Sequence, residues 1–128
     1  KNNITLYEDN NQIDMEKLNN AIKFASLEEV INKKIDSLDF RVGENNKFLS
    51  GGEAQRIGIA RAIYKNAEIL IFDEFTSNLD RTNKKLIFSN LEKIRNKKTI
   101  IAVTHDEEIL EFFDKVYNVK ELLINISK

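Results

Sequence analysis

The stretch Glu68-Ile69-Leu70-Ile71-Phe72-Asp73-Glu74 decides the fold class of this chain. Its continuous apolar run is typical of a strand buried on both faces of a parallel sheet, so we expect a strand over residues 68–72. A second run of strand length spans Thr99 to Val103, and apolar residues recur at helical spacing between the two runs, from Asn83 to Asn96. Strand, helix and strand in this order predict a βαβ unit and an α/β fold.

Polar side chains follow both predicted strands. Asp73 and Glu74 come directly after the first, and His105, the only histidine, follows the second. Because ligands bind beyond the carboxyl ends of parallel strands, we expect these three side chains at one edge of the sheet. Asp73 can hold Mg²⁺, which prefers a few hard oxygen ligands, and Glu74 can orient and deprotonate a water molecule. Taken alone, the two carboxylates fit an ordinary strand end equally well.

The turn Leu49-Ser50-Gly51-Gly52-Glu53 leads into a predicted helix that extends to Lys65. Ser50 and Glu53 have the spacing of a capping box, which is a purely structural role. The free N–H groups of a helix start, with two glycines beside them, also form an anion site that phosphate can approach. No lysine follows the glycines, so this turn is not a phosphate-binding P-loop.

The other segments predict short helices and a terminal strand pair. The predicted helices and strands are Met15–Phe24 capped by Asp14, Leu27–Asn32 with a capping box of Ser26 and Glu29, Asp106–Phe113, and the strand pair Val116–Tyr117 with Leu122–Ile126.

Composition restricts the class of protein. The chain has 128 residues, 20 basic and 21 acidic, and a net charge of −1, which gives no large nucleic-acid footprint. It has no cysteine, so disulfides and thiolate metal sites are excluded. No run approaches the ~20 apolar residues of a membrane span, so any membrane role would need another polypeptide region.

The ordered set of motifs closely resembles the ABC ATPase family. It consists of Leu49-Ser50-Gly51-Gly52-Glu53-Ala54-Gln55-Arg56, Ile69 to Glu74, Ser77-Asn78-Leu79-Asp80 and Thr104-His105. The resemblance implies that Leu49, Ser50, Gly51, Gly52 and Glu53 form the signature motif, which contacts ATP bound to the opposite subunit. Glu53 stands where many members carry Gln.

The resemblance also assigns roles to the residues that follow the strands. It makes Asp73 the Mg²⁺ ligand of Walker B, Glu74 the catalytic base and His105 the switch histidine on the γ-phosphate. Ser77, Asn78, Leu79 and Asp80 become the D-loop at a dimer interface. The triplet Val42-Gly43-Glu44 resembles the exporter loop that touches the transmembrane domain.

The implied fold is the second half of a P-loop NTPase-like (RecA-like) core with the ABC helical subdomain. We expect residues 1–66 to be that subdomain and residues 67–128 the catalytic part. No Gly-x-x-x-x-Gly-Lys-Ser/Thr occurs, so we expect the fragment to be inactive alone. Because it has no apolar run long enough for a membrane span, we also expect it to be soluble as a fragment. In the full-length protein the implied function is ATP-driven solute export at the cytoplasmic face of the cell membrane, with a second nucleotide-binding domain, homo- or heterodimeric, and a transmembrane domain as partners. The alternatives are a soluble ABC ATPase acting on DNA or ribosomes, and a non-catalytic interaction module.

Overall fold

The computed structural model describes residues 2–6, 9, 11–34 and 49–119. The elements are, in chain order, α1 (Asn2–Thr5), α2 (Met15–Phe24), α3 (Glu28–Lys34), α4 (Gly51–Lys65), β1 (Ile69–Asp73), α5 (Arg81–Glu92), β2 (Thr99–Val103) and the 3₁₀ helix η2 (Glu107–Phe112). The Val42-Gly43-Glu44 loop and the predicted strand Leu122–Ile126 lie outside the described residues.

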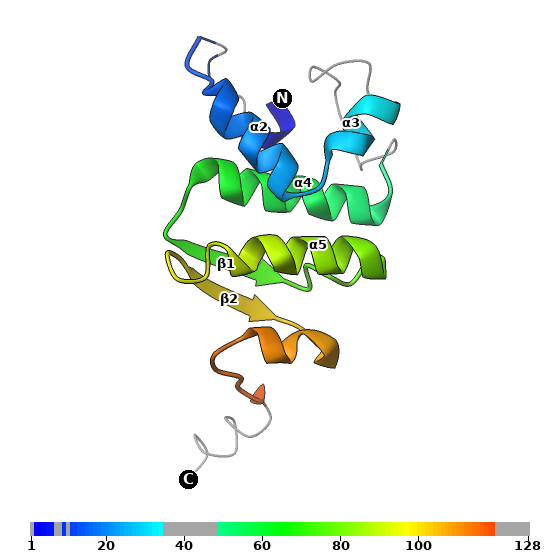
Figure 1. The fold of residues 1–128 in the computed structure, drawn as a ribbon, viewed down its shortest axis with the longest axis vertical. Helices are drawn as coiled ribbons and strands as arrows, with labels where there is room; N and C mark the ends of the chain where they lie inside the picture. Colours follow the sequence, from blue (N-terminus) through cyan, green and yellow to red (C-terminus); the bar gives the residue numbers. More distant parts are fainter. Residues whose placement is uncertain (1, 7–8, 10, 35–48, 120–128) are drawn as a thin grey trace.

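The predicted βαβ unit is confirmed. β1 and β2 pair in parallel, in a register that runs from Ile69 opposite Thr99 to Asp73 opposite Val103, and α5 connects them. In Figure 1, α2 and α3 lie beyond α4, the sheet and α5 lie on the other side of α4, and η2 follows β2. Helix α4 therefore stands between the N-terminal helices and the sheet.

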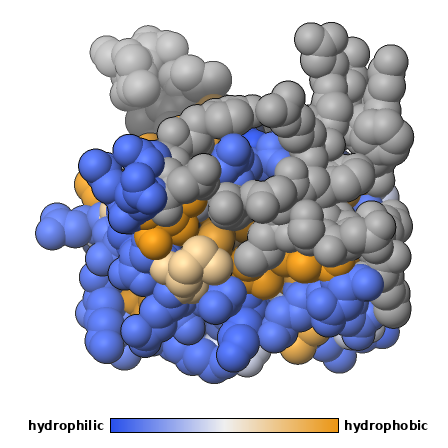
Figure 2. Space-filling model, turned by 90° about the horizontal axis from the view of Figure 1, so that it is seen from above, coloured by the Kyte–Doolittle hydropathy of each residue, from blue (hydrophilic) through white to orange (hydrophobic). Residues whose placement is uncertain are grey.

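One hydrophobic core joins these layers. It includes Leu18 of α2, Ile57 of α4, Leu70 of β1 and Leu91 of α5, which are all at most 8% exposed. Seen from the end that carries α2 and α3, the described surface is mostly hydrophilic, with some hydrophobic residues showing between the hydrophilic ones (Figure 2). Among the described residues, no helix is long and apolar enough to cross a membrane.

The prediction that β1 is buried on both faces is wrong for this chain. Leu70 and Phe72 are 2% and 6% exposed, but Ile69 and Ile71, on the opposite face, are 55% and 72% exposed. The reason is topological: the core of α4 and α5 covers one face, and the described residues do not cover the other. Within the described part of the chain, one apolar face of the sheet is thus left open.

Helix starts follow the capping residues. Asp14 accepts from the N–H of Lys17 at 2.9 Å, as predicted. Asp80 accepts from the N–H of Asn83 at 2.9 Å, and this cap starts α5 at Arg81, two residues earlier than expected from apolar spacing. Helix α5 ends at Glu92, four residues before the predicted end.

Two predictions of local structure are wrong, and a predicted helix is present but of another type. Ser26 does not cap α3: its φ is 53°, in the left-handed region, whereas an N-cap residue is extended, and its N–H donates to Lys23 at the end of α2. The segment predicted as a helix from Asp106 forms the 3₁₀ helix η2, because its bonds run between residues three apart, as from Phe113 N–H to Leu110 C=O. Val116 and Tyr117 form no strand.

Candidate functional site

The ends of β1 and β2 bring the predicted polar residues together. Asp73 and Val103 are partners in the register, so the next residues of both strands emerge at the same edge. The N–H of Glu74 donates to the carbonyl of Val103 at 2.9 Å, which extends the pairing one residue beyond the strand. The expected placement of Asp73, Glu74 and His105 at one edge is confirmed.

Glu74 and His105 contact one another directly. Nδ1 of His105 lies 2.8 Å from Oε2 of Glu74, a distance at which Nδ1–H donates to a carboxylate. The histidine side chain is 81% exposed and the glutamate side chain 37% exposed, so both remain accessible to a ligand in solution. This bond leaves Nε2 of His105 as the ring nitrogen that can face a ligand.

The backbone of Glu74 has an uncommon conformation. Its φ is 47°, in the left-handed region that residues other than glycine rarely adopt. Such a conformation is unfavourable and persists only where the surroundings enforce it, which is frequent at functional sites. Here the turn after β1 directs the glutamate side chain toward the end of β2.

Asp73 suits a magnesium ion only as one ligand among several. The described residues contain no group of three His, Cys, Asp or Glu side chains that could hold a metal ion on their own. Mg²⁺ does not need such a group, since it usually takes one or two carboxylates, several waters and phosphate oxygens of the substrate. The exposed carboxylate at the end of β1 fits that chemistry.

The turn that starts α4 is a complete capping box. Oγ of Ser50 accepts from the N–H of Glu53 at 3.2 Å, and Oε2 of Glu53 accepts from the N–H of Ser50 at 2.7 Å. The structural role predicted from the spacing is therefore confirmed. The first bond inside the helix runs from Ala54 N–H to Ser50 C=O, so the N–H groups of Gly51 and Gly52 lie in the turn whose amides have no partner within the helix.

This turn packs against the segment Ser77–Asp80. A Cβ atom placed on Gly52 would lie only 2.5 Å from the carbonyl oxygen of Asn78, so the close approach requires glycine. Within Ser77–Asp80, Leu79 is 7% exposed and Asp80 caps α5, whereas Ser77 and Asn78 are exposed. Hydrogen bonds from Asn83 lower the pKa of the Asp80 carboxyl below its ordinary value.

Gln55 is a residue of the site whose contacts the sequence did not reveal. Its Nε2 donates to the carbonyl of Glu74 at 3.1 Å and to Oγ of Ser77 at 2.8 Å. Its Oε1 accepts from the N–H of Asn78 at 3.1 Å. The only sequence signal was its position two residues after Glu53 within the motif, because its partners are about twenty residues away along the chain.

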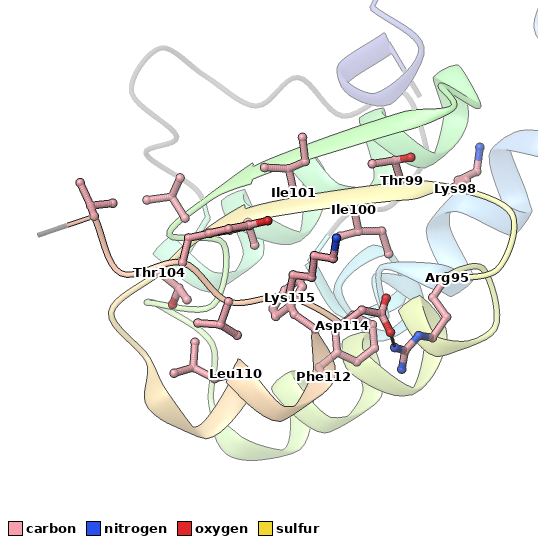
Figure 3. Close-up of a pocket in the computed structure, with 16 residues that line it drawn as sticks. Arg95, Lys98, Thr99, Ile100, Ile101, Thr104, Leu110, Phe112, Asp114 and Lys115 are labelled. Atoms are coloured by element: carbon pink, nitrogen blue, oxygen red, sulfur yellow. Dashed lines mark hydrogen bonds and ion pairs between the residues drawn. The ribbon is translucent and has the colours of Figure 1, made fainter. Parts of the chain in front are cut away.

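A groove on the described surface lies away from these residues. A groove of about 650 Å³ runs along β2 and the segment from Leu110 to Val119. Figure 3 shows Ile100 and Phe112 in its lining, with Arg95 and Asp114 joined by an ion pair. The groove includes Thr104 but not Asp73, Glu74 or His105, and its lining is mostly apolar. The candidate functional site is therefore the edge at the ends of the strands, and the groove is a part of the sheet that the described residues cover incompletely.

Comparison with known proteins defines the class. A model of the family described as ABC transporter matches residues 1–77. The chain therefore belongs to the ABC transporter family, and its parallel strands and helices are those of the P-loop NTPase-like fold of that family.

The chain is similar to several individual members of this family. The chain is 42% identical over 101 residues to an ATP-dependent lipid A-core flippase of Aliivibrio fischeri, covering 79% of the chain and 17% of the flippase. It is 36% identical over 120 residues to the protein of that name in Vibrio parahaemolyticus, covering 94% and 20%. A solved bacterial Atm1-family ABC exporter with ATP bound matches with a TM-score of 0.76 at 33% identity, covering 85% of the chain and 19% of the exporter. The chain thus spans about a fifth of the length of these relatives.

Proposed function

We propose that this chain is part of an ATP-hydrolysing domain that powers solute export across a membrane. The observation that carries the proposal is the Glu74–His105 contact of 2.8 Å beside Asp73, at the common end of two parallel strands. The relatives support it by their names, which include an ATP-dependent flippase and an exporter with ATP bound. In this proposal, residues 1–66 form the helical subdomain and residues 67–128 belong to the catalytic core.

The residues at the end of the strands divide the chemistry among themselves. The carboxylate of Glu74 orients the attacking water and accepts its proton. His105 holds that carboxylate through Nδ1, and its Nε2 is the group that would face the γ-phosphate. Asp73 would hold Mg²⁺, which when bound supplies charge neutralisation on the β- and γ-phosphates.

The turn that starts α4 serves a different ATP molecule in this proposal. The Leu49–Glu53 turn carries amide groups and a helix dipole that favour an anion, and Gly51 and Gly52 allow a phosphate to approach the backbone. We propose that this anion is the γ-phosphate of ATP held by a second nucleotide-binding domain, identical or related. The exposed residues Ser77 and Asn78, beside this turn, would lie at the same interface.

The proposed membrane partner follows from the exporter resemblance. The Val42-Gly43-Glu44 loop would contact a transmembrane domain at the cytoplasmic face of the membrane. No nucleic-acid partner is proposed, since the net charge of the chain is −1. By itself the 128-residue chain should hydrolyse no ATP. In P-loop NTPases the backbone amides and the lysine of the P-loop neutralise most of the charge of the triphosphate. This sequence contains no Gly-x-x-x-x-Gly-Lys-Ser/Thr motif to do so.

The test is Glu74→Gln in the full-length transporter. ATP turnover should fall by ~10²-fold or more, the scale of a lost general base, while ATP binding persists because the amide has nearly the same shape. Glu68→Gln is the matched control, since this exposed glutamate precedes β1 at the other end of the strand. Near-normal turnover of Glu74→Gln would overturn the proposed role.

A further inference from the structure

The side-chain amide of Gln55 joins the first turns of α4 to the loop that follows β1. It donates to the Glu74 carbonyl at 3.1 Å and to Ser77 Oγ at 2.8 Å, and it accepts from Asn78 N–H at 3.1 Å. Both the nitrogen and the oxygen of the amide therefore form hydrogen bonds, and one side chain binds the loop at Glu74, Ser77 and Asn78. Gln55 is only partly exposed, so these bonds are partly protected from competing water.

These bonds act on the residue whose backbone conformation is least favourable. Glu74 has φ of 47°, and its carbonyl accepts from both Gln55 Nε2 and the N–H of Ser77, the latter at 3.1 Å. On the other side, its N–H is bound to Val103 at 2.9 Å. Since a left-handed glutamate persists only where its surroundings enforce it, the two peptide groups that flank its Cα must both be held. The bond to β2 holds one of them, and Gln55 together with the N–H of Ser77 holds the other.

We propose that Gln55 is a positioning residue for ATP hydrolysis. This proposal rests on the proposed function of Glu74 as the catalytic base. By fixing the Glu74 peptide, it sets the direction of the carboxylate toward His105 and the attacking water. The same amide anchors Ser77 and Asn78 beside Gly52. It thus links the turn proposed to contact ATP on a partner domain with the residue proposed to act on ATP within its own domain.

Replacement by methionine separates this role from simple packing. Gln55→Met keeps the length of the side chain and removes all three hydrogen bonds, and Gln12→Met is the same change at an exposed position before α2. In the full-length transporter, turnover at saturating Mg-ATP should fall by about 10-fold or more in Gln55→Met, as expected for a misplaced catalytic group. The KM for ATP should stay within about two-fold, because ground-state binding is not the target. The Gln12→Met control should keep normal turnover.

A double-mutant cycle distinguishes positioning from a loss of stability. If Gln55 acts through Glu74, adding Gln55→Met to Glu74→Gln should lower turnover by less than about two-fold further. If Gln55 only stabilises the fold, the double variant should lose the same further factor as Gln55→Met alone, and the inference is overturned. Unchanged turnover in Gln55→Met overturns it as well.

Thermal unfolding sets the assay temperature, so that every variant is folded when turnover is measured. The outcomes for the two proposals differ. Normal turnover in Glu74→Gln would overturn the proposed function itself. If Glu74→Gln instead loses turnover strongly, and the double variant loses the same further factor as Gln55→Met alone, only the proposed role of Gln55 is overturned.

Discussion

Two glycines of α4 allow a matched test of how closely the Ser50–Glu53 turn packs on Ser77–Asp80. Gly52 lies in the first turn and Gly58 in the middle of the same helix. A Cβ on Gly52 would meet the Asn78 carbonyl oxygen at 2.5 Å, whereas a Cβ on Gly58 would meet nothing within 4 Å. The same substitution, glycine to alanine, should therefore have opposite effects at the two positions.

The magnitudes follow from these distances. At Gly58, alanine removes the entropic cost of a helical glycine and should stabilise the fold by about 0.5–1 kcal/mol. At Gly52 the contact is about 1 Å shorter than a favourable one, and the opposing atom belongs to the backbone, so the loop itself must move. Overpacking of this kind costs about 1–3 kcal/mol. We expect the two variants to differ in the free energy of unfolding by about 1.5–4 kcal/mol.

Urea unfolding of the 128-residue chain, followed by far-ultraviolet circular dichroism, measures this difference. Hydrogen exchange adds a local readout: the Asn78 amide, which donates to Gln55 Oε1, should exchange faster in Gly52→Ala but not in Gly58→Ala. Equal or greater stability of Gly52→Ala, with unchanged exchange at Asn78, would refute the packing argument. A substitution at Gly52 therefore reports on contacts within the chain as well as on any partner.

Two further predictions concern the core and the end of β2. Leu91→Ala should lower the free energy of unfolding by about 2–5 kcal/mol, because Leu91 is fully buried. Leu86→Ala on the same helix should lower it by less than about 0.5 kcal/mol, because Leu86 is 47% exposed. Similar urea midpoints for the two variants would contradict this difference in burial. The hydrogen bond from Lys84 lowers the pKa of Asp106 below its ordinary value of 3.8, so the folded chain holds this proton less tightly than the unfolded chain. Its stabilisation is then present above about pH 4 and lost as pH falls through the folded pKa. When the pH is lowered from about 5 to about 2.5, the urea midpoint of Asp106→Asn should therefore drop less than that of the parent chain. An equal drop would show that the Asp106 carboxylate does not contribute this stabilisation.

Strong local signals made much of the fold predictable. The apolar runs at Ile69–Phe72 and Thr99–Val103 predicted both strands, because runs of this length are typical of strands and too short for most helices. Their parallel pairing then fixed the edge where Glu74 meets His105. The capping box of Ser50 and Glu53 was also readable, since it involves residues only three apart.

Other features depend on contacts that local patterns do not report. The three partners of Gln55 lie 19 to 23 residues away, and nothing in the spacing of the motif selects them. The short distance between Gly52 and Asn78 also arises only once α4 and the loop after β1 are packed together. The early cap of Asp80 was missed because the apolar positions of α5 begin later than its first turn.

The open face of the sheet connects the core to the site. Parallel strands are almost always covered on both faces, yet Ile71 of β1 and Val103 of β2 are 72% and 57% exposed. Ile71 stands two residues before Asp73, and Val103 stands two residues before His105, so both lie close to the polar residues at the edge. A polypeptide segment that covered this face would therefore also reach Asp73, Glu74 and His105. Burial of the open face and completion of the proposed phosphate site would then result from the same contact, so a partner that supplies phosphate-binding groups should also stabilise the fold.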